Sequence, residues 1–333
     1  MHRYGTHRVV EPRGVLPQQA LLLDARSPLC DDEIAIDVEH LNIDSASWHQ
    51  IKEECGSDAD AMSKHLRTLI ETAGKMHNPA TGSGGMLVGT VAEVGKDRDD
   101  VTVGTRVATL VSLTLTPLIV DEILHLDPQS EKVKVRGRAI LFASGIFAEV
   151  PDDMSDESAL GILDVCGAPA WVTHLAEPGM KVVVIGAGGK SGLLAGVQAK
   201  RRVGPTGRVL GLCWPAATAS DADAVGMEAI AVDCTSPLAV AEEVLAAWGE
   251  EADLVVVCSN VPGCEGGAIL ACKTDGRVLF FSMATSFPAA ALTAEGLGKA
   301  CEMTIGNGYM PGHAELALDL VRSEPALWQR FCG

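Results

Sequence analysis

The chain has 333 residues, about twice the usual size of one domain, so we expect two domains with separate hydrophobic cores. Apolar residues make up 47% of the sequence and 35 residues are glycine, which excludes disorder as the main state. The 44 acidic and 26 basic residues give a net charge of −18, the wrong sign for a nucleic-acid partner. No apolar run approaches the roughly 18 to 20 residues of a membrane span, and residues 1–14 lack the apolar core of a secretion signal. We therefore expect a cytoplasmic protein without a membrane partner.

The first 150 residues have the alternating pattern of an antiparallel β domain. Strands are predicted at residues 33–44, 89–95 and 104–113, where β-rich runs are bounded by turn residues. Residues 58–73 instead place apolar side chains on one face of a helix. The glycine-rich loop GKMHNPATGSGG (74–85) follows and is the main irregular feature of this half.

From about residue 153 strands alternate with helical segments, which predicts βαβ units and a parallel sheet. The predicted strands are 181–185, 208–212, 229–232, 254–258, 278–281 and 303–305. The first and fourth are nearly continuous Val/Ile runs, as expected of strands that are buried on both faces.

A glycine-rich turn follows the first of these strands. It reads GAGGKSG (186–192), with a strand before it and a helical segment after it, and this context predicts a dinucleotide site. Its spacing is GxGxxxG, one residue longer than the usual GxGxxG. A phosphate loop of the GxxxxGK[ST] type would need glycine at Val184, inside the strand, so we discard it. The alternative is a Rossmann-like domain whose glycines serve packing only.

The second strand of a dinucleotide-binding domain usually ends on a carboxylate that binds the adenosine ribose. Here the sequence reads LCWPAA (212–217), without a carboxylate, and residues 213–220 contain no Arg or Lys for a 2′-phosphate. We therefore expect NAD rather than NADP. The expected cofactor-binding residues are Gly186, Gly188, Gly189, Lys190, Ser191, Gly192, Cys213, Ser259, Asn260, Ser282 and Met283.

Several segments resemble the successive signatures of medium-chain dehydrogenases: GTVAEVG (89–95), VGTRV (103–107), VPDDMSDESAL (150–160) and PGMKVVVIGAGG (178–189). The resemblance implies an α/β protein with a GroES-like, β-rich catalytic domain and a Rossmann domain built on a doubly wound parallel sheet. We expect the catalytic domain at 1–152 and 307–333 and the NAD-binding domain at 153–306. The zinc ligands of that family are missing, because Gly84-Gly85-Met86 and Asn42-Ile43-Asp44-Ser45 stand in their places and no CxxC is present. We therefore expect no metal.

A narrower resemblance covers nearly the full length. It rests on YGTHRVVEPRGVLPQ (4–18), LNIDSAS (41–47), GKMHNPATGSGGML (74–87), FFSMATSF (280–287), AEGLGKA (294–300) and IGNGYMPGHA (305–314). These segments resemble the L-erythro-3,5-diaminohexanoate dehydrogenase family of lysine fermentation. The resemblance implies an amino acid substrate, whose 3-amino group is oxidised with NAD to give 5-amino-3-oxohexanoate, ammonium and NADH.

Without zinc, side chains must supply each proton transfer of a deamination. Asp44 stands near the place of the first zinc ligand of medium-chain dehydrogenases, and Asp164 stands in LDVCGAP, before the first strand of the nucleotide domain. His77 lies in the glycine-rich loop and titrates near neutrality. We expect these three residues to be catalytic; the alternatives are capping or turn formation for the aspartates and a surface position for the histidine.

The implied substrate carries one carboxylate and two amines, so its site needs a cation at one end and a carboxylate at the other. Arg8 and Lys75 are the candidates for the substrate carboxylate, and Glu295 and Glu315 for the distal ammonium. The alternative for each is an ordinary surface charge. We also expect a homo-oligomer, with a dimer favoured.

Two other functions are compatible with the same plan. A zinc-independent quinone or enone reductase, or an alcohol dehydrogenase, would need no charged anchors for a substrate. An NADPH-dependent reductase would also favour a basic residue after the second Rossmann strand, which the chain lacks. A module that senses NAD(H) without turnover would not need the polar loop 74–85.

Overall fold

The computed structural model describes residues 2–333. The chain divides into two compact units, one up to Leu160 and the other Gly161–Gly333. Each unit has its own cluster of buried apolar side chains. None of the helices in the described residues is long and apolar enough to cross a membrane.

The first unit is built on an antiparallel six-stranded sheet of order β6-β7-β3-β4-β5-β8. Its strands are β3 (Ile34–Ile43), β4 (Gly85–Val94), β5 (Arg106–Thr109), β6 (Leu118–Leu126), β7 (Lys132–Leu141) and β8 (Phe147–Glu149). The N-terminal segment adds η1 (Thr6–Arg8) and a small sheet of β1 (Val9–Glu11) and β2 (Leu22–Leu23), and η2 spans Leu113–Leu115. The predicted antiparallel domain is thus confirmed, with β5 shorter than the expected 104–113.

Two helices accompany this sheet. Helix α2 (Ala59–Ala73) begins after Asp58, whose side chain accepts a hydrogen bond from the Ala61 amide, and it buries Met62, Leu66 and Ile70 on one face. It ends at Gly74, whose φ of 65° suits glycine. Helix α1 (Ser45–Glu54), which the sequence pattern did not predict, begins after Asp44.

The second unit contains a parallel six-stranded sheet of order β11-β10-β9-β12-β13-β14. The six predicted strands match β9 (Lys181–Ile185), β10 (Arg208–Cys213), β11 (Glu228–Ala231), β12 (Ala252–Val257), β13 (Cys272–Phe280) and β14 (Glu302–Ile305). Strand order reverses on either side of β9, which creates the crevice where doubly wound sheets bind ligands.

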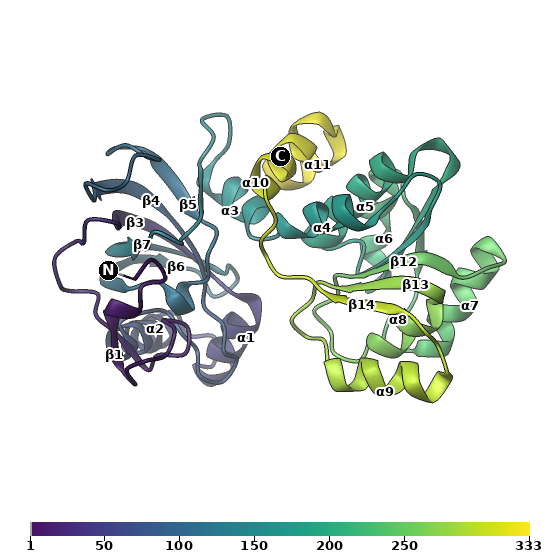
Figure 1. Cartoon of the computed structure of the whole chain (residues 1–333), viewed down its shortest axis with the longest axis horizontal. Coiled ribbons are helices and arrows are strands. Elements are labelled where there is room, and N and C mark those ends of the chain that lie inside the picture. Colours follow the sequence, from purple (N-terminus) through teal and green to yellow (C-terminus); the bar gives the residue numbers. More distant parts are fainter. Residues whose placement is uncertain (1) are drawn as a thin grey trace. The chain divides into compact units, whose positions relative to one another are not determined.

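Helices cover both faces of this sheet: α4 and α5 lie on one side, and α7, α8 and α9 on the other (Figure 1). Their bounds are α4 (Gly167–Leu175), α5 (Lys190–Val203), α6 (Ala219–Ala224), α7 (Pro237–Trp248), α8 (Glu265–Ala271) and α9 (Phe287–Leu297), with η3 (Gly204–Thr206) and η4 (Ala216–Thr218). Helix α3 (Asp156–Leu163) spans the boundary between the two units.

The C-terminal segment differs from the expected domain division. Residues 307–333 were expected to rejoin the N-terminal domain, but they belong to the second unit. Helix α10 (His313–Ser323) packs against α4 and α5, and α11 (Pro325–Cys332) packs against α10. The indole of Trp171 on α4 also donates to the Asn307 carbonyl at 2.9 Å. The buried apolar face of α10 explains the difference, because it is satisfied within this unit.

Candidate active site

The turn between β9 and α5 has little room for side chains at three of its glycines. Gly186 has a φ of +81°, and a Cβ there would lie 2.8 Å from the Ser259 amide nitrogen. A Cβ on Gly192 would lie 2.2 Å from the Gly186 carbonyl oxygen, and one on Gly188 would lie 2.5 Å from the Thr218 carbonyl oxygen. Packing within the protein itself therefore requires glycine at these three positions.

Gly189 differs from the other three glycines. It is exposed, has an ordinary φ of −81°, and a Cβ there would meet only the Gly186 oxygen, at 3.5 Å. It is the N-cap of α5, and no side chain caps that end of the helix. The positive end of the helix dipole is thus open to an anionic group, which is the arrangement that binds a pyrophosphate.

The other expected cofactor-binding residues lie at or just after the ends of strands β10, β12 and β13. Cys213 is the last residue of β10, Ser259 and Asn260 follow β12, and Ser282 and Met283 follow β13. Because these strands are parallel and adjacent to β9 or β12, the residues share one edge of the sheet with the glycine turn. Cys213 is fully buried, and burial raises the pKa of its thiol. Met283 is 82% exposed.

In the first unit, Asp44 is held by two donors. Its Oδ1 accepts from the Ala46 amide and from the Ser83 hydroxyl, each at 3.0 Å. The Ser83 hydroxyl lies 2.7 Å from that of Ser47, which is buried and lies 2.6 Å from that of Thr81. A carboxylate only accepts, so Ser83 donates to Asp44. The Ser83 oxygen then accepts from the neighbouring hydroxyls of Ser47 and Thr81, the second of which lies 3.0 Å away. Asp44 is therefore both a helix cap and the end of a hydroxyl chain.

Sequence reasoning missed this hydroxyl chain. The signal was the pair of hydroxyl residues Thr81 and Ser83 in ATGSG (80–84), together with Ser47, three residues after Asp44. The loop that carries them is fixed by Asn78, which is buried. The backbone amide of Asn78 donates to the Ser83 carbonyl at 3.0 Å, and the side-chain Nδ2 of Asn78 donates to the Gln50 side chain at 2.8 Å.

Lys75 and His77 lie at the start of the same loop. Lys75 was expected to bind the substrate carboxylate, but its side chain is fully buried and its Nζ donates to the Pro17 and Gln18 carbonyls at 2.8 and 2.9 Å. This contradicts the expected role, because a buried ammonium with these partners does not face a ligand. His77 is partly buried, and its buried Nδ1 has no hydrogen-bond partner among the described residues.

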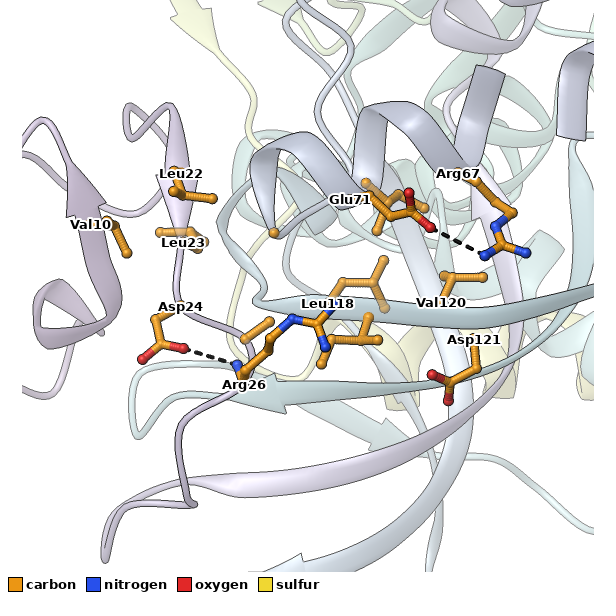
Figure 2. Close-up of a pocket in the computed structure, with 14 residues that line it drawn as sticks. Val10, Leu22, Leu23, Asp24, Arg26, Arg67, Glu71, Leu118, Val120 and Asp121 are labelled. Atoms are coloured by element: carbon orange, nitrogen blue, oxygen red, sulfur yellow. Dashed lines mark hydrogen bonds and ion pairs between the residues drawn. The ribbon is translucent and has the colours of Figure 1, made fainter. Parts of the chain in front are cut away.

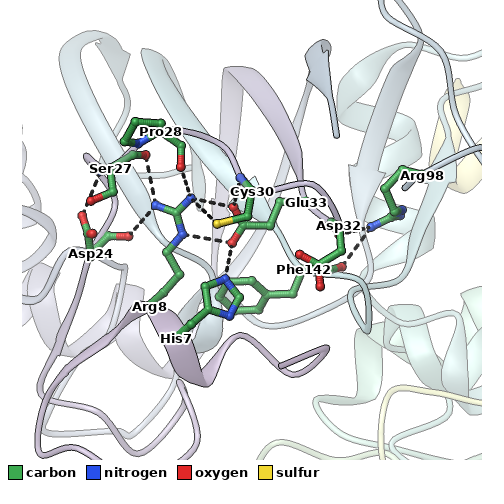
Figure 3. Close-up of polar contacts among 10 residues, drawn as sticks. All are labelled: His7, Arg8, Asp24, Ser27, Pro28, Cys30, Asp32, Glu33, Arg98 and Phe142. Atoms are coloured by element: carbon green, nitrogen blue, oxygen red, sulfur yellow. Dashed lines mark hydrogen bonds and ion pairs between the residues drawn. The ribbon is translucent and has the colours of Figure 1, made fainter. Parts of the chain in front are cut away.

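Arg8, the other expected carboxylate anchor, is also in a different setting (Figure 3). It is 2% exposed, and its guanidinium donates to Glu33 and to the carbonyls of Ser27 and Pro28. Glu33 is fully buried and accepts further bonds from Cys30 and His7. The ion pair lowers the pKa of Glu33 despite the opposing effect of burial, which is the largest single influence. Arg8 is therefore a structural cation, and its expected role in substrate binding is contradicted.

The remaining candidates lie in the second unit and are exposed. Asp164 follows α3, Glu295 lies on α9, and Glu315 lies in the first turn of α10. Burial, followed by the charges of Asp164 and Glu315, raises the pKa of the Cys166 thiol to about 12. Asp164 and Glu315 therefore both lie near the Cys166 thiol, whereas Glu295 lies on α9.

A pocket of about 430 Å³ opens in the first unit and contains none of the expected site residues (Figure 2). It lies between strand β2 with the segment that follows it, helix α2 and strand β6, and its lining is partly aliphatic and partly charged. Its lining includes Leu23, Arg26, Arg67, Glu71, Leu118 and Asp121. Arg67 and Glu71 form an ion pair at 3.2 Å.

The fold, an antiparallel β-rich unit followed by a parallel sheet with a glycine turn, is shared with solved alcohol dehydrogenases and reductases. The structure is similar to that of a zinc-dependent alcohol dehydrogenase from Streptococcus pneumonia, with a TM-score of 0.57, 17% identity, and coverage of 92% of this chain and 85% of that one. It is also similar to the CurK enoyl reductase, with a TM-score of 0.56, 15% identity, and coverage of 92% and 83%.

The sequence comparisons are more specific. Residues 7–151 match the family signature of the L-erythro-3,5-diaminohexanoate dehydrogenase N-terminal domain. The L-erythro-3,5-diaminohexanoate dehydrogenases of Acetoanaerobium sticklandii and Fusobacterium nucleatum are 48% and 45% identical to this chain, over 99% of it and 97% of each relative. The chain belongs to the L-erythro-3,5-diaminohexanoate dehydrogenase family.

Proposed function

We propose that this chain oxidises L-erythro-3,5-diaminohexanoate with NAD, giving 5-amino-3-oxohexanoate, ammonium and NADH, in lysine degradation. It is thus an oxidoreductase that acts on a CH–NH2 group. The observation that carries the proposal is the 48% identity over nearly the whole length to a relative of that name. The quinone reductase and NAD-sensing alternatives have no comparable support.

The chain's residues fit a nicotinamide dinucleotide. The open N-terminus of α5 at Gly189, Lys190 and Ser191 would hold the pyrophosphate, and the strand ends near Cys213 and Ser259 would hold the two ends of the molecule. When bound, the nicotinamide supplies the hydride acceptor. Cys213 offers no cation for a 2′-phosphate, and residues 213–220 contain no Arg or Lys, which supports NAD over NADP.

The reaction consumes water and releases ammonium, NADH and a proton. The substrate ammonium must lose a proton before hydride can leave C3, and water must then be activated to displace the nitrogen. Hydrogen bonds from the Ser83 hydroxyl and the Ala46 amide hold the Asp44 side chain in place, and this carboxylate is one proposed proton acceptor. Burial, followed by the charge of Lys75, lowers the pKa of His77, so that its imidazole is neutral and able to accept a proton at neutral pH. Asp164 is the third proposed group.

The proposal is tested by following NADH formation with 3,5-diaminohexanoate, simple 3-amino acids, alcohols and quinones. We expect turnover with 3,5-diaminohexanoate and NAD, and a lower kcat/KM with NADP. Turnover of alcohols or quinones, with none of any 3-amino acid, would refute the function.

Single variants assign the proton-transfer groups. Asp44→Asn, His77→Gln and Asp164→Asn should each be compared with Asp37→Asn, which changes an exposed carboxylate on β3. Loss of an essential base lowers kcat by about two to four orders of magnitude while NAD still binds. Three rates close to that of Asp37→Asn would remove the assignment.

The expected homodimer and cytoplasmic location stay predictions. Light scattering of the purified chain gives the subunit number directly.

A further inference from the structure

Lys75 is a buried cation without an acidic partner. Its side chain is fully buried, and among the described residues its Nζ is bonded only to the carbonyl oxygens of Pro17 and Gln18. Burial alone lowers the pKa of this ammonium to about 8, so it is mostly charged at neutral pH. An unpaired buried charge is costly, and an apolar side chain of similar length could fill the same space at lower cost.

The position of Lys75 joins two segments that are far apart in the sequence. It directly follows Gly74, where α2 ends against the N-terminal segment so closely that a Cβ would lie 2.1 Å from the Leu23 carbonyl oxygen. Its bonds to Pro17 and Gln18 secure the start of the 75–84 loop. The far end of that loop is secured by the Asn78–Ser83 turn and by the bond from Ser83 to Asp44.

His77 lies between these two fixed points. Its Nδ1 is buried without a partner, so no neighbouring acceptor favours the protonated ring. Burial is the main cause that lowers the pKa of this imidazole, and the charge of Lys75, two residues away, lowers it further. Among the described residues, the Nζ of Lys75 in turn donates only to backbone carbonyls.

We propose that Lys75 is a positioning residue for His77: its two bonds to the N-terminal segment fix the start of the loop that carries His77, and its positive charge adds to burial in disfavouring the protonated imidazole. This inference rests on the proposed function, in which a neutral His77 accepts a proton from the substrate ammonium. It explains why a charged side chain stands where an apolar one would be less costly.

Two variants separate the charge from the hydrogen bonds. Lys75→Gln retains an N–H donor for the carbonyls but removes the charge, whereas Lys75→Met removes both. Lys64→Gln is the matched control, because Lys64 is an exposed lysine on α2. The direct readout is the titration of the His77 imidazole by ¹⁵N NMR, which requires neither substrate nor cofactor.

We expect the His77 pKa to rise in Lys75→Gln and Lys75→Met and to stay unchanged in Lys64→Gln. The acid limb of the kcat/KM profile should move to higher pH in the same two variants. An unchanged His77 titration in Lys75→Gln overturns the proposal, and this variant decides the matter even where Lys75→Met fails to fold. A parent without deaminase activity would refute the proposed function separately, since the NMR titration does not depend on it.

Discussion

At the scale of single residues, Arg8 and Lys75 show how burial changes the role of a cation. Both were expected to bind a substrate carboxylate, and both are instead buried and hydrogen-bonded to partners within the protein. Their partners are 25 and about 60 residues away in the sequence: Glu33 for Arg8, and the carbonyls of Pro17 and Gln18 for Lys75. Such long-range contacts leave no local pattern, so composition and spacing could not have predicted them.

Replacing Arg8 tests its structural role. Arg8→Met leaves the buried Glu33 carboxylate without its cation, so the free energy of unfolding should fall by about 3 to 5 kcal/mol. Denaturant unfolding measures this loss, and KM for the amino acid substrate should stay close to that of the parent. Arg67→Met, which removes a half-exposed ion pair on α2, is the control and should cost about 1 kcal/mol or less. A raised KM with unchanged stability would restore Arg8 as a substrate ligand.

Lys75 makes the stability of the protein depend on pH in a defined window. Its pKa is about 8 in the folded chain and 10.5 in an unfolded one. Between these values the unfolded chain binds more protons, so stability increases as the pH rises. Each pKa unit corresponds to about 1.4 kcal/mol, so the gain is on the order of 3 kcal/mol by about pH 10.5. Below pH 8 the full cost of the buried charge is present.

The Lys75→Met variant isolates this effect, because other titrating groups are common to both proteins. The difference in free energy of unfolding, parent minus variant, should become more favourable to the parent from pH 8 upward. A difference that is constant between pH 7 and 10 would show that burial does not lower the pKa of Lys75.

At the scale of elements, the parallel sheet was predictable and parts of the antiparallel sheet were not. Strands such as β9 and β12 are buried on both faces and appear as short, nearly continuous Val/Ile runs. Strands β6 and β7 carry many charges, have an irregular burial pattern, and pair with shifts in register. Helix α1 is polar along most of its length, so no apolar periodicity marks it.

The glycine turn between β9 and α5 was predicted correctly as an element. The structure, however, changes which glycine should be replaced to test NAD binding. Gly192→Ala places a Cβ 2.2 Å from a carbonyl oxygen and should destabilise the fold by more than about 1 kcal/mol. A larger substitution at Gly188 would press on Thr218 in the same way, so lost NAD binding there would not distinguish packing from cofactor contact.

Gly189 is the matched position, because a Cβ there meets only the Gly186 carbonyl oxygen, at an ordinary contact distance of 3.5 Å. Gly189→Ala should leave the melting temperature unchanged and Gly189→Val should fold, yet both should weaken NAD binding by crowding the open end of α5. Isothermal titration calorimetry with NAD and thermal unfolding give the two readouts. Parent-like NAD affinity in a folded Gly189→Val variant would mean that the pyrophosphate does not bind at this helix end.

At the scale of the whole molecule, the expected proton-transfer groups belong to both units: Asp44 and His77 to the first, Asp164 to the second. Asp44 could be singled out from the sequence because the resemblance to medium-chain dehydrogenases places it near a zinc ligand of those enzymes. It could not show the chain of Thr81, Ser47 and Ser83 behind it, since that chain forms only when the 75–84 loop folds against α1.

Catalysis without a metal is the prediction that involves the whole molecule. The sequence resemblance puts Gly84 and Gly85 where medium-chain dehydrogenases have a zinc-ligand pair, and neither glycine can carry a side chain. A Cβ would lie 2.5 Å from the Met76 carbonyl oxygen at Gly84 and 1.9 Å from the Asn42 carbonyl oxygen at Gly85. Two groups of side chains among the described residues have ligand-like geometry, His7 with Cys30 and Glu33, and Glu39 with His40 and Asp156. Arg8 pairs with Glu33 in the first, and Arg106 pairs with Asp156 in the second.

An arginine in each group already neutralises the carboxylates and repels a divalent cation, so neither group should retain zinc. We expect elemental analysis of the purified chain to find far less than one zinc per subunit. After exhaustive dialysis against a chelator, kcat with 3,5-diaminohexanoate should be unchanged, with a zinc-dependent alcohol dehydrogenase losing activity in parallel as the control. Stoichiometric zinc whose removal abolishes turnover, and whose return restores it, would mean that a metal replaces the proton-transfer groups proposed here.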